Sequence, residues 1–119
     1  MNSKGIVTIF GGSGFVGRHL VGQLAKAGYR IRVAVRHPQL AGFLQPLGGL
    51  NQIEFVKANI RNENSIKEAV EGADYVVNLV GILAQSGRQN FNSLHVQGAR
   101  LIAIASREAG VKQLVQMSA

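Results

Sequence analysis

The chain has 119 residues, of which 46% are hydrophobic and 16% charged, proportions typical of one folded domain and not of a disordered segment. It contains no cysteine, which excludes disulfides, thiolate chemistry and cysteine-ligated metal sites. No apolar run reaches the ~18 residues of a membrane span, and the N-terminus carries no signal-peptide pattern. We therefore expect a protein of the cytoplasm or of an organelle matrix.

The formal net charge of +7 is large for this length and is unevenly distributed. The first acidic residue is Glu54, and the cations that precede it are Lys4, Arg18, Lys26, Arg30, Arg32 and Arg36. Such a charge attracts a polyanion: nucleic acid, an anionic membrane or a phosphate-rich small molecule. Because the chain has five Phe, two Tyr and no Trp, it offers no aromatic platform for single-stranded bases. A phosphate-rich cofactor is therefore favoured over nucleic acid.

Short apolar runs alternate along the chain with segments of helical periodicity. Strands are predicted over 5–10, 29–35, 53–57, 75–80 and 112–117, and helices over 14–27, 62–70 and 91–109. The buried stripe predicted for the first helix consists of Val16, Leu20, Leu24 and Ala27. Asn62 or Asn64 is the predicted N-cap of the second helix. The segments 38–51 and 81–90 are predicted to be largely irregular connections.

Strands that alternate with helices predict an α/β fold, a doubly wound parallel (Rossmann) sheet of strand order 3-2-1-4-5. In such a sheet the ligand crevice lies where strands one and four part. Strand five is then an open edge with which a second copy could pair. Because the chain stops directly after this strand, with no closing helix, we expect it to be the N-terminal part of a longer protein.

Gly11, Gly14 and Gly17 follow the first strand in the pattern G-x-x-G-x-x-G, a relative of the dinucleotide-binding fingerprint. Gly11 can turn sharply, Gly14 leaves space for a pyrophosphate, and Gly17 lets the next helix lie close to the sheet. The helix N-terminus then directs free N–H groups and its positive dipole end at the phosphates. The sequence thus predicts an NAD(P)-binding domain over 1–119. The cofactor contacts predicted in this turn are Gly11, Ser13, Gly14, Phe15, Val16 and Gly17.

The end of the second strand distinguishes NAD from NADP in this architecture. An acid there binds the 2′-hydroxyl of the adenosine ribose, whereas an arginine accommodates a 2′-phosphate. Here the residue is Arg36, about 20 residues beyond the glycines, and no acid precedes Glu54. We predict NADP(H) in preference to NAD(H), with His37 and Arg18 adding to the same positive patch. The alternative is that Arg36 is only a solvated residue at a strand end.

Six short motifs along the chain resemble those of a known family. They are G-G-S-G-F-V-G at 11–17, V-R-H at 35–37, A-N-I-R at 58–61, V-N-L-V-G at 77–81, L-H-V-Q-G-A-R at 94–100 and L-V-Q-M-S at 114–118. Together they resemble the extended and atypical short-chain dehydrogenase/reductases, the group that includes NAD-dependent epimerases and dehydratases. Within it they are most similar to the nucleotide-binding accessory subunit of respiratory complex I and its bacterial homologues.

The resemblance implies an adenine contact after the third strand. Asn59 stands where the family usually has an aspartate that contacts the adenine amino group, and the Ile60 backbone reaches the ring. The neutral amide of Asn59 departs from that pattern and is a weaker partner. The alternative interpretation is that Asn59 is a simple turn residue before the helix cap.

The resemblance also implies contacts from strands four and five. The backbone that passes the ribose on the nicotinamide side is that of Leu79, Val80 and Gly81. Ser118 matches a serine that lines the cofactor site without doing chemistry. Asn78 is interpreted as a buried amide that finds a hydrogen-bond partner.

The catalytic residues of the family are absent from this sequence. The family transfers protons with a tyrosine and a lysine four residues later, well downstream of strand five, and this chain ends before that position. Neither Tyr29 nor Tyr75 is followed by such a lysine. Both tyrosines are expected at strand starts, opposite the crevice. His95 matches a helix asparagine of the catalytic members, although a lone helix histidine is more often structural. No histidine or carboxylate has metal-ligand spacing. No catalytic or metal-binding residue is predicted within the 119 residues.

Three functions follow from these observations. The first is an NADP(H)-binding domain that holds its cofactor without catalysis, in the manner of the complex I subunit, peripheral to a membrane complex and, in mitochondria, on the matrix side. The second is the N-terminal fragment of an NAD(P)-dependent oxidoreductase or a sugar-nucleotide epimerase or dehydratase. The third is a nucleic-acid-binding protein on the same scaffold, suggested only by the +7 charge.

Overall fold

The computed structural model describes residues 4–11, 15–40, 42–49, 52–80 and 89–116. The strands are β1 (Ile6–Phe10), β2 (Arg30–Val35), β3 (Ile53–Lys57), β4 (Tyr75–Asn78) and β5 (Gln113–Gln116). The α-helices are α1 (Phe15–Lys26), α2 (Glu63–Val70) and α3 (Gln89–Glu108), and two short 3-10 helices, η1 (Pro38–Leu40) and η2 (Gly42–Leu47), join β2 to β3.

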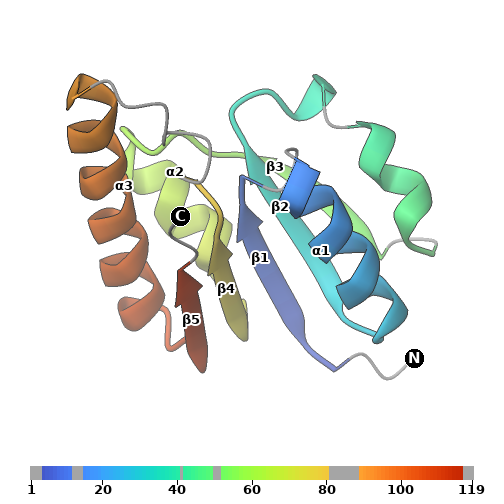
Figure 1. Cartoon of the computed structure of the whole chain (residues 1–119). Helices are drawn as coiled ribbons and strands as arrows, with labels where there is room; N and C mark the ends of the chain where they lie inside the picture. The colour runs from blue at the N-terminus through green and yellow to red at the C-terminus, as the bar shows by residue number, and fades with distance from the viewer. Residues whose placement is uncertain (1–3, 12–14, 41, 50–51, 81–88, 117–119) are drawn as a thin grey trace.

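The five strands form one parallel sheet in the order β3-β2-β1-β4-β5 (Figure 1), which confirms the predicted fold and strand order. β1 is central: Ile9 pairs with Val33 of β2 on one side and with Val77 of β4 on the other. Because all neighbouring pairs are parallel, the carboxyl ends of the strands meet at one edge of the sheet. The order reverses between β1 and β4, so this edge has the predicted switch point.

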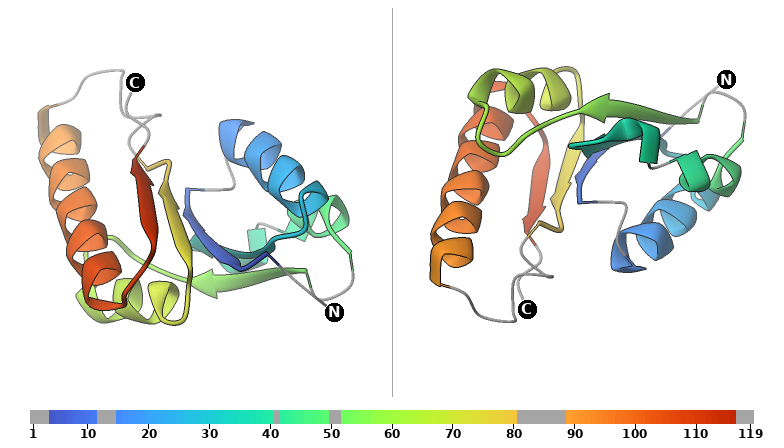
Figure 2. Two further views of the ribbon diagram at one scale, coloured as in Figure 1. Left: turned by 90° about the horizontal axis from the view of Figure 1, so that it is seen from below. Right: turned by 90° about the horizontal axis from the view of Figure 1, so that it is seen from above.

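Helices cover both faces of the sheet (Figure 2). On one face α1 and η2 enclose a cluster that includes Ile9, Val21 and Leu44, each fully buried. On the other, α2 and α3 enclose a cluster that includes Ile66 and Ile102. Successive strand residues point to opposite faces of the sheet, and this is why the central strands β1 and β4 are largely apolar.

Helix α1 presents a different face to the sheet from the one predicted. Its buried line is Gly17, Val21 and Ala25, whereas Val16 is 40% exposed and Ala27 is exposed. Leu20 and Leu24 are only partly buried, at the flank of the cluster. The reason is steric: small residues spaced by four allow the closest approach of the helix to the sheet, and the larger leucines fill the sides.

Two element boundaries also differ from the prediction. β4 ends at Asn78 instead of residue 80, because the Asn78 side chain accepts a hydrogen bond from the Val80 N–H (2.9 Å) and turns the chain out of the ladder. α3 begins at Gln89, inside the segment predicted to be a loop. The N-cap of α2 is Asn62, whose Oδ1 accepts from the Ser65 N–H, as one of the two alternatives predicted.

The partly buried Arg32 is a structural residue that the sequence analysis counted only as charge. Its guanidinium donates to the carbonyl oxygens of Ala69 (2.8 Å) and Glu71 (2.7 Å) at the end of α2 and pairs with Glu54 (3.2 Å). The Thr8 hydroxyl donates to the same Ala69 oxygen (2.8 Å). Side chains from β1 and β2 thus satisfy carbonyl groups that a helix end leaves without intrahelical partners.

We expect Arg32→Met to lower the free energy of unfolding by about 2–3 kcal/mol, since it removes two charged hydrogen bonds to carbonyl oxygens at the end of α2, one of them partly buried. Urea denaturation at matched pH measures the change. Arg30→Met is the control, because Arg30 is exposed at the start of the same strand. Equal losses in the two variants would show that net charge, not the α2 contacts, is responsible.

Candidate cofactor site

Four strand ends lie together at the carboxyl edge of the sheet and form the floor of the predicted site. Hydrogen bonds continue beyond the strands there: the Leu79 N–H donates to the Phe10 oxygen (2.8 Å), and the Ala58 N–H donates to the Val35 oxygen (2.9 Å). The segments after β1 and β4, and those after β2 and β3, are therefore fixed against each other. In doubly wound sheets, this edge binds the ligand.

Gly11 makes the sharp turn predicted after β1. Its φ is +83°, which side chains disfavour, and a Cβ atom there would lie 3.1 Å from the Val80 nitrogen and 3.2 Å from the Leu79 carbonyl carbon. Two independent features therefore favour glycine at this position: the positive φ and the close approach of the segment after β4.

Helix α1 starts beside this edge, at Phe15, and carries no acid in its first turn. Its N–H groups and dipole favour an anion at that end. Gly17 is buried, as expected if it lets the helix approach the sheet. Residues 12–14, and with them Ser13 and Gly14, lie outside the described residues, as does the side chain of Phe15.

Arg36 and His37 directly follow β2 at the same edge, and both are exposed. Arg18, in the first turns of α1, is exposed too. A cation therefore follows β2 at the strand end where, in NAD-binding domains of this architecture, an acid binds a ribose hydroxyl. A guanidinium there can form charge-assisted hydrogen bonds with a phosphate.

The turn after β3 is closed by its own side chains. Asn59 Oδ1 accepts a hydrogen bond from the Arg61 N–H (2.9 Å), and the Asn59 carbonyl accepts from the Asn62 N–H (2.8 Å). Asn59 therefore serves as a turn residue, as the alternative interpretation predicts, and its contact with the adenine stays a prediction. Asn59 and Ile60 are half-buried.

The segment after β4 is well packed. Leu79 is buried in the α1-side cluster, and Val80 packs against the cluster on the opposite face. Asn78 is 1% exposed and is satisfied through Val80, so its interpretation as a hydrogen-bonded buried amide is confirmed. Gly81 and Ser118, and the side chain of His95, lie outside the described residues.

The tyrosines stand at the opposite edge, as predicted. The rings of Tyr29 and Tyr75 meet edge to face with centroids 5.9 Å apart, and the Lys4 ammonium lies 6.0 Å from the Tyr29 ring centre. Sequence spacing gave no sign of this pair, because only the parallel register brings the two strand starts together. Within the described ranges, no group of three His, Asp or Glu side chains could hold a metal ion.

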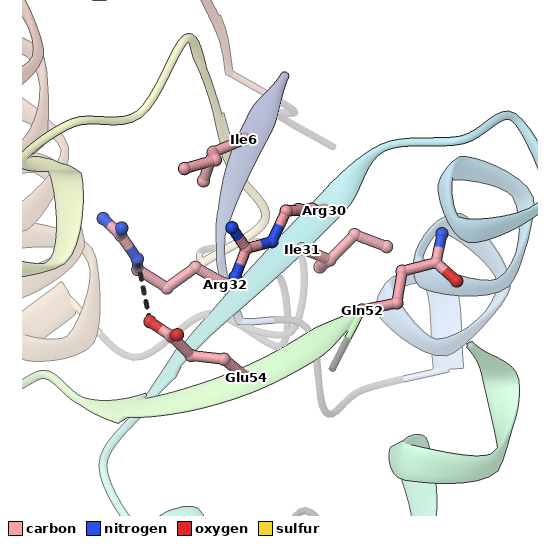
Figure 3. A pocket seen from close by; sticks show the side chains of 6 residues that line it. All are labelled: Ile6, Arg30, Ile31, Arg32, Gln52 and Glu54. Carbon is pink, nitrogen blue, oxygen red and sulfur yellow. Dashed lines mark hydrogen bonds and ion pairs between the residues drawn. The ribbon is translucent and has the colours of Figure 1, made fainter. Parts of the chain in front are cut away.

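A hollow of about 120 Å³ lies at this same amino edge (Figure 3). Its lining residues are Ile6, Arg30, Ile31, Arg32, Gln52 and Glu54. Arg32 and Glu54 of this lining form an ion pair, and Arg32 also donates to the end of α2. The hollow is therefore separate from the predicted cofactor site.

A family model described as NAD(P)H-binding matches residues 11–119. The chain belongs to this family. The match begins at the glycine turn and continues through β5, so it confirms the prediction of an NAD(P)-binding Rossmann domain. A nicotinamide dinucleotide is the cofactor of the domain.

Named relatives agree with the resemblance seen in the sequence. The chain is 32% identical over 114 residues to mouse (Mus musculus) mitochondrial NADH dehydrogenase (ubiquinone) 1 alpha subcomplex subunit 9, covering 95% of this chain and 30% of that protein. It is 32% identical over 117 residues to the ceramide reductase of Caulobacter vibrioides, covering 98% of this chain and 36% of that protein. The chain thus spans about a third of the length of these relatives.

Solved structures show the same fold. The crystal structure of vestitone reductase from alfalfa (Medicago sativa) superimposes with a TM-score of 0.78 at 26% identity, covering 95% of this chain and 36% of that one. The relatives are therefore a complex I subunit and reductases, which confirms the short-chain dehydrogenase/reductase resemblance. None of the helices in the described part of the chain is long and apolar enough to cross a membrane.

Proposed function

We propose that this domain binds NADP(H) in preference to NAD(H), with Arg36 as the group that recognises the 2′-phosphate. The observation that carries the proposal is the exposed arginine directly after β2, in a chain with no acid before Glu54. The glycine turn and the start of α1 supply the phosphate cradle beside it.

The proposed contacts divide along the cofactor. The pyrophosphate meets the turn made by Gly11, Ser13, Gly14, Phe15, Val16 and Gly17. The 2′-phosphate meets Arg36 and His37, and the adenine meets Asn59 and Ile60. The ribose on the nicotinamide side passes Leu79, Val80 and Gly81, with Ser118 nearby.

A thermal-shift titration with NADPH and NADH at one ionic strength tests the preference. A ligand at free concentration c that binds only the folded state stabilises it by RT ln(1 + c/Kd), so at equal concentrations the tighter ligand gives the larger shift. We expect the larger shift with NADPH. Equal shifts would overturn the assignment of the 2′-phosphate to Arg36, and no shift from either would count against cofactor binding by this chain.

For the whole protein we propose a non-catalytic, cofactor-holding subunit of a respiratory complex, on the mitochondrial matrix side or its bacterial equivalent. The support is the relative named as an NADH dehydrogenase subunit. The reductase relatives support the second candidate, an NAD(P)-dependent oxidoreductase. A Tyr-x-x-x-Lys pair encoded downstream of residue 119, together with NADPH oxidation by the longer protein, would favour the reductase.

The edge of β5 supports a proposal of self-association. Within the described residues β5 pairs only with β4, and Val115 on it is 40% exposed. Open strand edges pair readily with another chain. We expect light scattering to show a dimer at high concentration and Val115→Lys to shift the equilibrium toward monomer. A monomer at all concentrations would contradict this.

A further inference from the structure

One hydroxyl group forms hydrogen bonds with both ends of the turn from Asn59 to Asn62. Ser65, in the first turn of α2, accepts a hydrogen bond from the Asn59 N–H at its Oγ (3.0 Å). The same Oγ lies 3.1 Å from the Asn59 carbonyl oxygen and 2.8 Å from that of Asn62, to which it can donate. One side chain therefore fixes both ends of the turn.

The same turn lies directly against a glycine of α3. A Cβ atom at Gly98 would lie 2.9 Å from Ile60 Cβ and 3.1 Å from Ile60 Cδ1. The first contact involves the branch point of Ile60, so rotating its side chain cannot relieve it. Any side chain at position 98 must therefore displace the backbone of the turn or the helix.

We propose that Ser65 and Gly98 are positioning residues that set affinity for the adenosine half of the cofactor through the Asn59–Ile60 turn. This inference rests on the proposed function, in which Asn59 and Ile60 meet the adenine. Neither residue is in the proposed contact set. Ser65 bonds to the turn after β3 and Gly98 lies against Ile60 of that turn, whereas the segment after β4 is held by the Leu79 and Val80 hydrogen bonds. Small displacements of a positioning group cost binding selectively where that group contacts the ligand.

The test separates the two halves of the cofactor. Dissociation constants are measured by calorimetry or ligand NMR for NADPH, for 2′,5′-ADP, which carries only the adenosine half, and for reduced nicotinamide mononucleotide. We expect Ser65→Ala and Gly98→Ala to raise the dissociation constants of NADPH and 2′,5′-ADP by about three- to thirtyfold and to leave that of the mononucleotide unchanged. Ser65→Thr retains the hydroxyl and is expected to restore wild-type affinity.

Matched controls of the same residue types lie in α3 and α1. Ser106→Ala removes a buried hydroxyl for which the described residues provide no hydrogen-bond partner, and Gly22→Ala adds a Cβ with nothing within 4 Å. Both variants are expected to bind NADPH, 2′,5′-ADP and the mononucleotide as tightly as the wild type. If the Ser65 and Gly98 variants bound both half-ligands equally more weakly, or bound every ligand as tightly as the wild type, the inference would be wrong and the proposed function would stand. Failure of the wild-type chain to bind NADPH would overturn the proposed function and the inference with it.

Discussion

Arg36→Ala is expected to weaken NADPH binding by about ten- to a hundredfold while leaving NADH binding nearly unchanged. One charge-assisted contact between a guanidinium and a phosphate contributes on the order of 1.5–3 kcal/mol, and only NADPH carries that phosphate. Arg36 is exposed and directly follows β2, so the substitution removes no core contact and the fold should be retained. Titration of both cofactors against the variant at fixed ionic strength measures the ratio.

The matched control is Arg30→Ala. Arg30 is the first residue of β2 and Arg36 directly follows its last. Both are exposed, and both changes lower the net charge equally, but Arg30 stands at the amino edge. A local phosphate contact predicts that only Arg36→Ala changes the NADPH-to-NADH ratio. Equal effects would show that the general positive potential, not a specific contact, attracts the cofactor. Arg36→Asp should go further and favour NADH, since an acid there can bind the 2′-hydroxyl.

The fold could be predicted from the sequence because each central strand is an apolar run and each helix ends near a glycine. Gly28, Gly72 and Gly110 all have positive φ at those ends, as helix stops do. The face of α1 could not be predicted from hydrophobicity, because the closest packing is set by size. Gly17, Val21 and Ala25 are buried, whereas the larger Leu20 and Leu24 are only partly buried.

The sharp turn at Gly11 could be predicted from the sequence because it depends on backbone geometry, whereas contacts that depend on side-chain partners could not. Nothing in the spacing of Arg32 and Ala69 indicates that a strand arginine binds the end of α2. Likewise, Asn59 matched a ligand-contacting position by motif, yet its Oδ1 is occupied by the Arg61 N–H. The first contact joins residues distant in sequence, which only the assembled sheet brings together. In the second, a local turn takes up the side-chain oxygen that the motif assigns to the ligand.

Gly11→Ala is expected to destabilise the domain by about 2–4 kcal/mol and to weaken NADPH binding by at least about tenfold. Two costs combine: the positive φ, and the collision of the new Cβ with the Val80 nitrogen and the Leu79 carbonyl carbon. Since the atoms it meets belong to the backbone, no rotamer change relieves the contact. The segments after β1 and β4 must then separate, and these two segments border the crevice.

Gly72→Ala separates the two costs. Gly72 has a similar φ of +75°, but a Cβ there meets nothing within 4 Å, and it lies between α2 and β4, away from the carboxyl edge. This variant should lose only about 1–2 kcal/mol and keep its affinity for NADPH. Urea denaturation and cofactor titration of both variants decide the point. If Gly11→Ala cost no more stability than Gly72→Ala and bound NADPH as tightly, the close approach at Gly11 would have no part in forming the cofactor site.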